Sequence, residues 1–194
     1  MVKVYITLFL LFSCLAQAEI KKAVFAGGCF WCMEPPYEEQ KGVKSVISGF
    51  MGGDKENPPY KLVASGKTKH LEVVQITYDS DQISYNQLLD IFWRQIDPTD
   101  AGGQFVDRGE QYSTAIFYID DQQKQAAEAS KKKMQQSGRF SKSIVTKIRP
   151  AKTFYPADEY HQDYYKKNPV RYKFYRYRSG RDQYLKKIWG KPSS

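Results

Sequence analysis

The stretch Ala26-Gly27-Gly28-Cys29-Phe30-Trp31-Cys32 lies between an apolar run and a run that can form a helix. Residues 22–26 predict a short buried strand, and residues 30–40 predict a helix. Cys29 would then lie at the N-terminus of this helix, where unpaired backbone N–H groups and the helix dipole lower the pKa of a thiol. The two glycines permit a tight turn and the close approach of a ligand to the backbone. The stretch therefore predicts a reactive cysteine.

The second cysteine of this stretch, Cys32, follows Cys29 by three residues. One interpretation is a structural disulfide, which is the usual state of a cysteine pair in a secreted chain. A loop this short would contribute little entropic stabilisation when closed, so the spacing favours a redox couple instead. Cys32 would then attack whatever species forms on Cys29.

Length and composition indicate one domain that follows a leader. The chain has 194 residues, of which 41% are hydrophobic and 15% aromatic, which suits a single domain with a sizeable core. Lys3, the apolar run 4–12 and the sequence Ala16-Gln17-Ala18 are typical of a secretory signal peptide. We therefore expect cleavage after residue 18, a domain over residues 19–194, and export to the periplasm or the medium. The apolar run is too short to span a bilayer, so we expect no stable membrane insertion after cleavage.

Cys14 lies within the predicted leader, and its removal would leave only Cys29 and Cys32. The alternative is a lipoprotein signal, in which Cys14 would be lipidated and retained as a membrane anchor. Phe12 fits that pattern badly, so cleavage after residue 18 is the interpretation that we adopt.

Basic residues are concentrated late in the chain. The formal net charge is +9, and residues 166–191 interleave lysine and arginine with tyrosine. Such a pattern can bind single-stranded nucleic acid, but an exported protein rarely meets any. We therefore expect no nucleic-acid partner and a solvated basic surface whose tyrosines pack on the domain. Weak attraction to anionic lipid or to acidic partners is the alternative.

The remaining sequence predicts alternating strands and helices. Ser84 and Asp120 are suitable N-cap residues, and the prolines and glycines of residues 54–59 and 97–109 predict loops. The order of elements predicts an α+β fold with helices on one face of a mixed or antiparallel sheet and a split β-α-β arrangement, whose strand order stays open. The expected strands are 43–51, 70–78, 113–119 and 144–148, and the expected helices are 85–95, 121–137 and 156–166.

Several side chains could take part in chemistry at Cys29. Glu72 lies within an apolar strand, where the loss of hydration would raise the pKa of its carboxyl group and make it a proton donor. The alternative is an outward-facing glutamate that pairs with a lysine. Tyr60 and Tyr112 lie near the ends of predicted elements, although each is one of 15 tyrosines. His70 and His161 match no zinc-site spacing with the cysteines, so we expect no metal.

Four segments of the chain, taken together, resemble one known family. They are Gly28-Cys-Phe-Trp31 after a strand, His70-Leu-Glu72 before an alternating strand, Asp107-Arg-Gly-Glu-Gln-Tyr-Ser113, and Phe154-Tyr-Pro-Ala-Asp-Glu-Tyr-His161 with Lys167-Asn-Pro169. In order and spacing, over about residues 23–169, they are similar to the A-type peptide methionine sulfoxide reductases. The resemblance implies a ferredoxin-like two-layer α+β core. It also implies reduction of the S epimer of methionine sulfoxide, free or in proteins, as repair of oxidised proteins.

The resemblance implies a chemical role for the matching residues. Cys29 would attack the sulfoxide sulfur, which releases methionine and leaves a sulfenic acid on Cys29. Glu72, assisted by Tyr60 and Tyr112, would hydrogen-bond the sulfoxide oxygen and supply the proton. Neutral donors aimed at this oxygen would stabilise the charge that grows during the attack.

The resemblance also implies how the substrate and the reductant bind. Phe30 and Trp31 would form an apolar slot for the terminal methyl group, and Asp107 would position the substrate backbone or the loop around it. No cofactor is implied, the reductant would be a thioredoxin-like protein, and we expect a monomer.

Three positions depart from the common pattern of the family. Cys32 stands where glycine is usual, and no cysteine follows Pro169, where many members carry recycling cysteines. The resemblance therefore makes Cys32 the partner that forms a disulfide with Cys29. Lys69 replaces a glycine often found before the His-x-Glu segment, which affects the expected turn there but not Glu72.

Two other functions remain as alternatives. A Cys-x-x-Cys pair after a strand also describes thioredoxin-like thiol–disulfide oxidoreductases, but that fold usually has a proline-bearing loop facing the cysteines, which the order of elements does not clearly supply. The second alternative is a basic binding module formed by residues 166–194.

Overall fold

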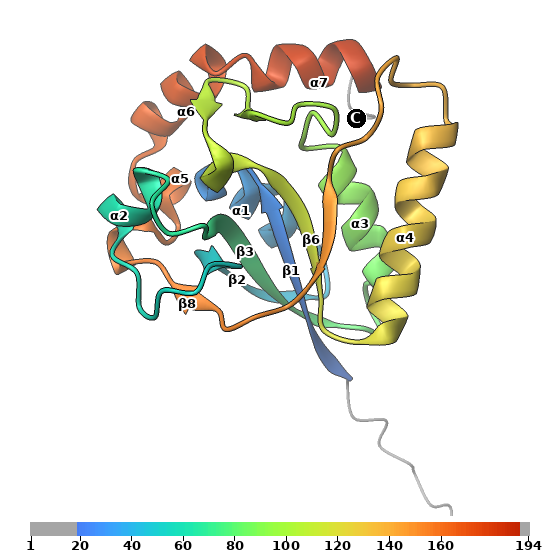
Figure 1. Ribbon diagram of the computed structural model, residues 1–194, viewed down its shortest axis with the longest axis horizontal. Coiled ribbons are helices and arrows are strands. Elements are labelled where there is room, and N and C mark those ends of the chain that lie inside the picture. Colours follow the sequence, from blue (N-terminus) through green and yellow to red (C-terminus); the bar gives the residue numbers. More distant parts are fainter. Residues whose placement is uncertain (1–18, 191–194) are drawn as a thin grey trace, which may run out of the picture.

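The computed structural model describes residues 19–190, in which a six-stranded sheet carries the other elements (Figure 1). The order across the sheet is β7-β6-β1-β3-β2-β8, and neighbouring strands are antiparallel except for the parallel pair β6 and β7. The strands are β1 (Ile20–Gly27), β2 (Val43–Met51), β3 (Leu71–Asp79), β6 (Thr114–Tyr118), β7 (Lys147–Pro150) and β8 (Tyr155–Pro156).

Three helices cover one face of the sheet: α1 (Phe30–Glu38), α3 (Tyr85–Trp93) and α4 (Asp121–Gln136) (Figure 1). α1 connects β1 to β2, with β3 between them, and α3 connects β3 to β6, with β1 between them. Two interlocked split β-α-β units of this kind define the ferredoxin-like arrangement. The predicted fold class is therefore confirmed, and the strand order that the sequence left open is β6-β1-β3-β2 at the centre.

Both faces of the central strands are buried. Phe25 of β1 points to the helices, where its ring stacks on Phe92 with centroids 5.2 Å apart. Its neighbours Val24 and Ala26 point to the opposite face, which the segment after β7 covers with Phe154. This alternation follows from the two-residue period of a strand. On β3 the same alternation directs Glu72 to the helix side, where Val74 and Ile76 enter the core.

The predicted N-caps are confirmed. The Ser84 side chain accepts a hydrogen bond from the Gln87 backbone N–H, and the Gln87 side-chain oxygen accepts one from the Ser84 backbone N–H, which makes a capping box at the start of α3. Asp120 accepts a hydrogen bond of 2.7 Å from the backbone N–H of Gln123 at the start of α4. These caps satisfy backbone donors that a helix terminus leaves unpaired.

The chain between residues 144 and 167 differs from the prediction. The strand expected over residues 144–148 is β7 at Lys147–Pro150, because Val145 instead donates its N–H to the carbonyl of Pro98. The helix expected over residues 156–166 is divided into β8, a 3-10 turn (Glu159–His161) and α5 (Tyr164–Lys167). Asp163 has φ +54°, a left-handed conformation that interrupts a right-handed helix.

The basic C-terminal region forms two helices that the sequence did not predict. They are α6 (Pro169–Arg178) and α7 (Arg181–Trp189), which lie across the end of the sheet where β1 leads into α1 (Figure 1). Pro169 occupies the first turn of α6, where its missing N–H costs nothing. The remaining short elements are α2 (Tyr60–Ala64), β4 (Gly103–Gln104), β5 (Asp107–Arg108) and a 3-10 turn (Glu110–Tyr112).

Two predictions concern residues outside the described range. The predicted leader, residues 1–18, and Cys14 within it are not among the described residues. Within residues 19–190, no helix combines the length and the apolar character that a membrane crossing requires.

Candidate active site

A tight turn delivers Cys29 from the end of β1 to the start of α1. Gly28 has φ +84°, the left-handed region that favours glycine, and Cys29 is the N-cap of α1. A Cβ atom on Gly28 would lie 2.6 Å from Cβ of Gln104 and 3.0 Å from Nη2 of Arg181. The sequence attributed this space to an approaching ligand. The structure instead fills it with two side chains of the chain itself.

Glu72 lies beside this turn on β3. Its side chain is 1% exposed, and its Oε2 accepts a hydrogen bond of 3.1 Å from the backbone N–H of Phe30, the first residue of α1. Burial raises the pKa of Glu72 to about 8, although the bond from Phe30 lowers it. No lysine forms an ion pair with Glu72 within residues 19–190. The carboxyl group therefore retains its proton at neutral pH.

The two cysteines are both reduced and differ in their acidity. Cys29 is 7% exposed and Cys32 is fully buried. Burial raises the pKa of Cys29, which is the reverse of the sequence prediction. The interaction with the Cys29 thiol, together with the charges of Arg181 and Arg176, lowers the pKa of Cys32 to about 6. The two thiols therefore titrate as a pair, in which Cys32 is the more acidic partner.

The two predicted tyrosines lie close to Glu72 and Cys29. Tyr60 begins α2, and Tyr112 ends the 3-10 turn before β6. Burial raises the pKa of both phenols, and ionisation of Glu72 or Cys29 would raise it further. Both tyrosines therefore stay neutral and can donate a hydrogen bond.

An aromatic cluster holds the predicted slot residues. The ring of Trp31 stacks on Tyr164 with centroids 3.6 Å apart, and its Nε1–H donates to Nδ1 of His161 over 3.2 Å. The ring of Phe30 is 1% exposed and lies 5.1 Å from that of His161 and 6.5 Å from that of Tyr60, measured between centroids. The two side chains proposed for the methyl slot thus have fixed orientations.

The two histidines serve different purposes. His161 accepts from Trp31 at Nδ1, and burial lowers its pKa to about 4, so it is neutral and carries its proton on Nε2. This buried N–H has no hydrogen-bond partner within residues 19–190. His70 instead accepts from the N–H of Gly53 at Nδ1 and contacts the carbonyl of Lys55 with Nε2, which fixes the loop after β2.

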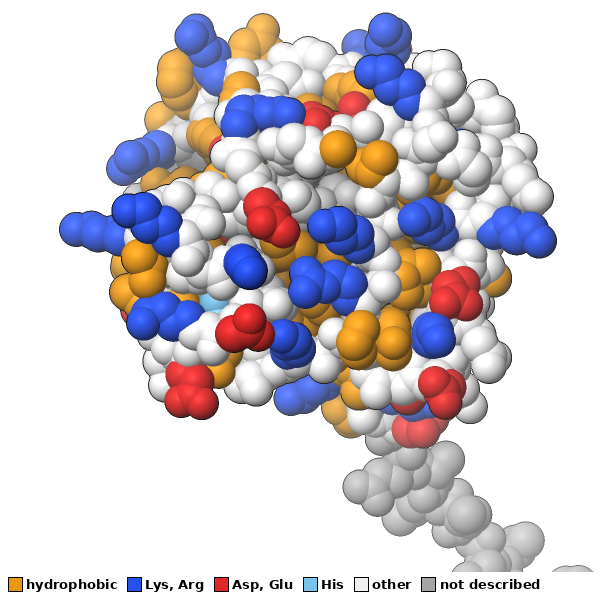
Figure 2. Space-filling view, viewed as in Figure 1, with side chains coloured by type: hydrophobic (Ala, Val, Ile, Leu, Met, Phe, Trp, Pro, Cys, Tyr) orange, Lys and Arg blue, Asp and Glu red, His pale blue; other side chains and the backbone are white. Residues whose placement is uncertain are grey.

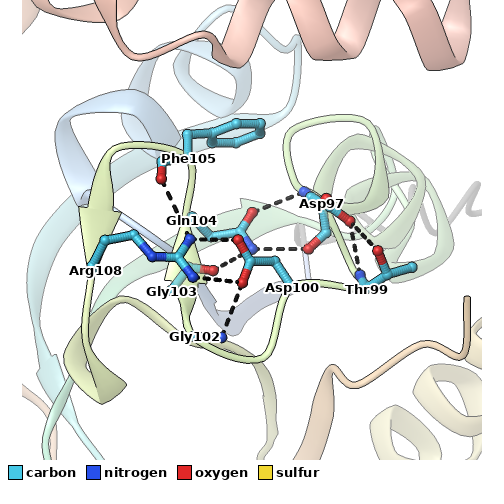
Figure 3. A network of polar contacts seen from close by, with 8 residues as sticks. All are labelled: Asp97, Thr99, Asp100, Gly102, Gly103, Gln104, Phe105 and Arg108. Atoms are coloured by element: carbon cyan, nitrogen blue, oxygen red, sulfur yellow. Dashed lines mark hydrogen bonds and ion pairs between the residues drawn. The ribbon is translucent and has the colours of Figure 1, made fainter.

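A polar network orders the loop between α3 and β6 (Figure 3). The guanidinium of Arg108 binds both carboxylate oxygens of Asp100. The Gln104 side chain donates to the carbonyl of Asp97 and accepts from its N–H, both over 2.8 Å. These bonds connect the short β4–β5 ribbon to the end of α3. They give Gln104 and Asp107 fixed positions behind the nucleophile turn.

Asp107, predicted to position the substrate, lies at the start of β5. Its Oδ2 accepts a hydrogen bond from the phenol of Tyr175 on α6. Burial raises the pKa of Asp107, although the bond from Tyr175 and the charge of Arg181 lower it. The sequence prediction did not include Tyr175, which links the loop to the C-terminal helices.

Two arginines of the C-terminal region also belong to the site. Arg181 is 1% exposed, and its guanidinium donates to the carbonyls of Gly27 and Gln95. Arg176 donates to the carbonyl of Cys32 over 3.2 Å. The expectation of a solvated basic surface is therefore wrong for these two residues. For Arg176 the spacing was the available signal, because positions 172, 175, 176 and 179 recur at the period of a buried helix face.

The site combines a Cys-x-x-Cys pair at a helix N-terminus with a protonated buried carboxyl group and two neutral phenols. This combination defines a thiol-dependent oxidoreductase that can protonate an oxygen while sulfur attacks. A family model described as peptide methionine sulfoxide reductase matches residues 21–193. The chain belongs to this family, whose members reduce methionine sulfoxide and so repair oxidised proteins.

Relatives and solved structures agree with this family. A peptide methionine sulfoxide reductase MsrA of Bacillus licheniformis is 57% identical over 169 residues, which is 87% of this chain and 93% of that protein. The MsrA of Bacillus subtilis is 55% identical over 168 residues, covering 87% and 95%. The crystal structure of reduced Mxr1 from Saccharomyces cerevisiae is similar with a TM-score of 0.73 and 33% identity, covering 77% of this chain and 86% of that one.

Proposed function

We propose that the chain reduces the S epimer of methionine sulfoxide through Cys29. The observation that carries the proposal is the bond of 3.1 Å from the Phe30 N–H to the protonated Glu72, next to the nucleophile. Hydrogen bonds and ring contacts hold Glu72, Phe30 and Trp31 in place beside Cys29. The sulfur of a sulfoxide is pyramidal and chiral, so a site that fixes both its oxygen and its methyl group relative to the nucleophile would accept one epimer.

The first step transfers oxygen from the substrate to Cys29. Cys29 passes its proton to the Cys32 thiolate and forms a bond to the sulfoxide sulfur, while Glu72 donates its proton to the oxygen. The protonated oxygen then moves from the methionine sulfur to the Cys29 sulfur: the S–O bond and the new S–S bond break, a bond from oxygen to Cys29 forms, and the products are methionine and a sulfenic acid on Cys29. Cys29 loses the two electrons that the substrate gains, and Glu72 regains a proton from solvent.

Cys32 resolves the sulfenic acid. Its sulfur attacks the Cys29 sulfur, which forms a Cys29–Cys32 disulfide and releases the hydroxyl group as water with the Cys32 proton. Cys32 is the only other cysteine within residues 19–190. Its backbone N–H donates to the carbonyl of Cys29 over 3.0 Å, so one helical turn connects the two sulfurs.

A thioredoxin-like protein is the proposed reductant, and yeast Mxr1 has been solved in complex with Trx2. A thiolate of this reductant would attack the Cys29 sulfur of the disulfide, since Cys29 is 7% exposed while Cys32 is fully buried. Cys32 would then depart, and its lowered pKa makes it the better leaving group. A second thiol of the reductant would release Cys29 and complete the exchange.

The assay that tests the reaction gives the reduced protein each epimer of methionine sulfoxide, and insulin as a disulfide substrate. We expect turnover of the S epimer alone with dithiothreitol, and none with Cys29→Ser. Mass spectrometry after one equivalent of substrate should find a Cys29–Cys32 disulfide. Insulin reduction without sulfoxide turnover would instead identify a thiol–disulfide oxidoreductase.

Trapping tests the direction of recycling. A thioredoxin that retains only its attacking cysteine should form a mixed disulfide with the oxidised protein. We expect peptide mapping to locate this disulfide at Cys29. A mixed disulfide at Cys32 would contradict the proposed order of attack.

We also propose that the protein is exported after cleavage behind residue 18. The pattern of residues 1–18 supports this proposal, and β1 begins only at Ile20, so cleavage removes no strand residue. The intact mass of the mature protein tests it: a chain that begins at Glu19 is expected. A lipidated chain that begins at Cys14 would contradict it.

A further inference from the structure

The outer face of α6 exposes large apolar side chains that the site does not use. Val170, Phe174 and Tyr177 are 82%, 66% and 69% exposed. At about 100° per residue, they lie within about 60° of one another around the helix. We call these three residues the outer stripe. An aligned set of large exposed apolar side chains marks an interaction surface more often than scattered ones do.

The opposite face of α6 is committed to the active site. Tyr172 packs on Cys32, Tyr175 donates to Asp107, and Arg176 donates to the carbonyl of Cys32. These contacts fix the rotation of the helix. The outer stripe therefore cannot turn inward to bury its side chains, and it remains directed to solvent.

Basic side chains border the outer stripe on both sides. Arg171 and Arg178 lie about 100° and 80° from Val170 in one direction, and Lys173 lies about 60° away in the other. None of these three forms an ion pair within residues 19–190. Residues 164–181 contain no aspartate or glutamate. Figure 2 shows blue and orange side chains gathered over α6 at the upper left.

We propose that the outer stripe and its basic borders dock on an anionic lipid surface. A helix that lies in a membrane interface buries its apolar side chains among the acyl chains, while lysine and arginine on either side reach the anionic headgroups. The outer stripe has this order of charge and apolar groups. Docking would also bring the site close to the membrane, because the inner face of the same helix lines it.

Other occupants fit this surface less well. A second copy would bring like charges together, since the borders of the stripe are basic on both sides. A protein partner would need a groove for a convex helix, whereas a lipid interface requires no complementary shape. The proposal goes beyond methionine sulfoxide reduction and does not depend on the mechanism proposed for it.

Vesicle sedimentation tests the proposal with the chain of residues 19–194. We expect binding to vesicles that contain phosphatidylglycerol, weakened by salt, and no binding to pure phosphatidylcholine. Two triple variants should each lose at least about tenfold in affinity for these vesicles. They are Val170→Ser, Phe174→Ser, Tyr177→Ser, which removes the outer stripe, and Arg171→Gln, Lys173→Gln, Arg178→Gln, which removes its basic borders. Both should reduce free methionine sulfoxide at the rate of the unmodified chain, which shows that they fold.

A third triple variant separates location from net charge. Lys132→Gln, Lys133→Gln, Lys142→Gln removes the same charge from exposed positions on and after α4, and it should bind the anionic vesicles normally. Equal weakening by this variant would overturn the proposal in favour of diffuse electrostatic attraction. Undiminished vesicle binding by the variant that lacks the outer stripe would also overturn the proposal. The same holds if the chain does not bind vesicles but binds an acidic thioredoxin in a way that requires the outer stripe.

Discussion

At the scale of single residues, the reaction depends on the proton held by Glu72. Burial raises the pKa of Glu72 to about 8, so the donor is protonated at lower pH and is lost as the pH rises through that value. Glu72→Gln retains an acceptor for the Phe30 N–H but has no proton to transfer. We expect the single-turnover rate to fall by about 10²–10⁴-fold and its alkaline decline to disappear, with little change in substrate affinity. Stopped-flow tryptophan fluorescence as a function of pH measures this.

Glu34→Gln is the matched control for this variant. Glu34 is equally buried, and burial raises its pKa to about 7, but its carboxyl group bonds to Ser48 away from the site. The variant should retain both the rate and the alkaline decline. An alkaline decline that persists in Glu72→Gln, or a loss confined to affinity, would count against the proton role of Glu72.

Cys32 has two roles in the proposed sequence, and Cys32→Ser should affect both. Without the thiolate that accepts the Cys29 proton, the single-turnover rate should fall. Without a resolving sulfur, the protein should stop after one turnover with thioredoxin, with a sulfenic acid on Cys29 that dimedone traps. Multiple turnover at the normal rate would show that Cys32 is dispensable.

The backbone of Lys69 is strained, at a position where the sequence already indicates an unusual turn. Its φ is +55°, a left-handed conformation that costs a residue with a Cβ about 1–2 kcal/mol. Lys69→Gly should therefore increase the free energy of unfolding by about 1 kcal/mol, after the greater chain entropy of glycine is subtracted. Urea denaturation measures the change. Lys67→Gly, at an exposed position two residues earlier, is the control and should not stabilise the protein.

At the scale of elements, α7 acts on the site through Arg181. Arg181→Met removes hydrogen bonds to the carbonyls of Gly27 and Gln95 and should destabilise the fold by about 2–4 kcal/mol. It also removes a charge that lowers the pKa of Cys32, so that pKa should rise. The pH dependence of iodoacetamide alkylation in a Cys29→Ser background measures the pKa, because Cys32 is then the only thiol of the domain.

Arg181→Lys separates the two effects of this side chain. It retains the charge but not the forked pair of hydrogen bonds, so it should restore most of the Cys32 acidity and little of the stability. If the pKa of Cys32 is the same in Arg181→Met, in Arg181→Lys and in the unmodified chain, the role of Arg181 is structural only.

The elements that the sequence predicts well are those with a local signal. The apolar alternation of residues 70–78 and the cap residues Ser84 and Asp120 suffice to locate β3, α3 and α4 to within about one residue at their starts. The sequence did not predict α6, because tyrosine and arginine form the buried face of this helix while valine and phenylalanine lie on the exposed face. Its apolar residues therefore form no single stripe. A binary pattern cannot identify a helix whose two faces are both mixed.

Site residues follow the same distinction between local and distant causes. The pKa of Cys29 was predicted from the helix N-terminus alone, and burial by the surrounding fold reverses the direction. Arg181 bonds to carbonyls that lie 154 and 86 residues away along the chain. Contacts of this kind arise from the packing of the whole domain, and no local pattern encodes them.

At the scale of the whole molecule, the C-terminal helices close the domain behind the nucleophile turn. The guanidinium groups of Arg94 and Arg139 lie over the indole ring of Trp189, at 4.7 and 4.3 Å from its centroid. Tyr184 packs against Phe105 of the ordered loop. These contacts connect α7 to the ends of α3 and α4, so α7 stabilises more than the residues around Cys29.

A chain that ends at Ser179 should therefore lose more than Arg181→Met does. It lacks Arg181 and also the contacts of Tyr184 and Trp189, so its melting temperature and its kcat/KM for methionine sulfoxide should both fall below those of the point variant. Circular dichroism and the steady-state assay measure the two quantities. The control ends at Gly190 and keeps every α7 contact described above, and it should match the full chain. Because the basic helices pack into the domain, full activity in the chain that ends at Ser179 would mean that α7 is only an appendage.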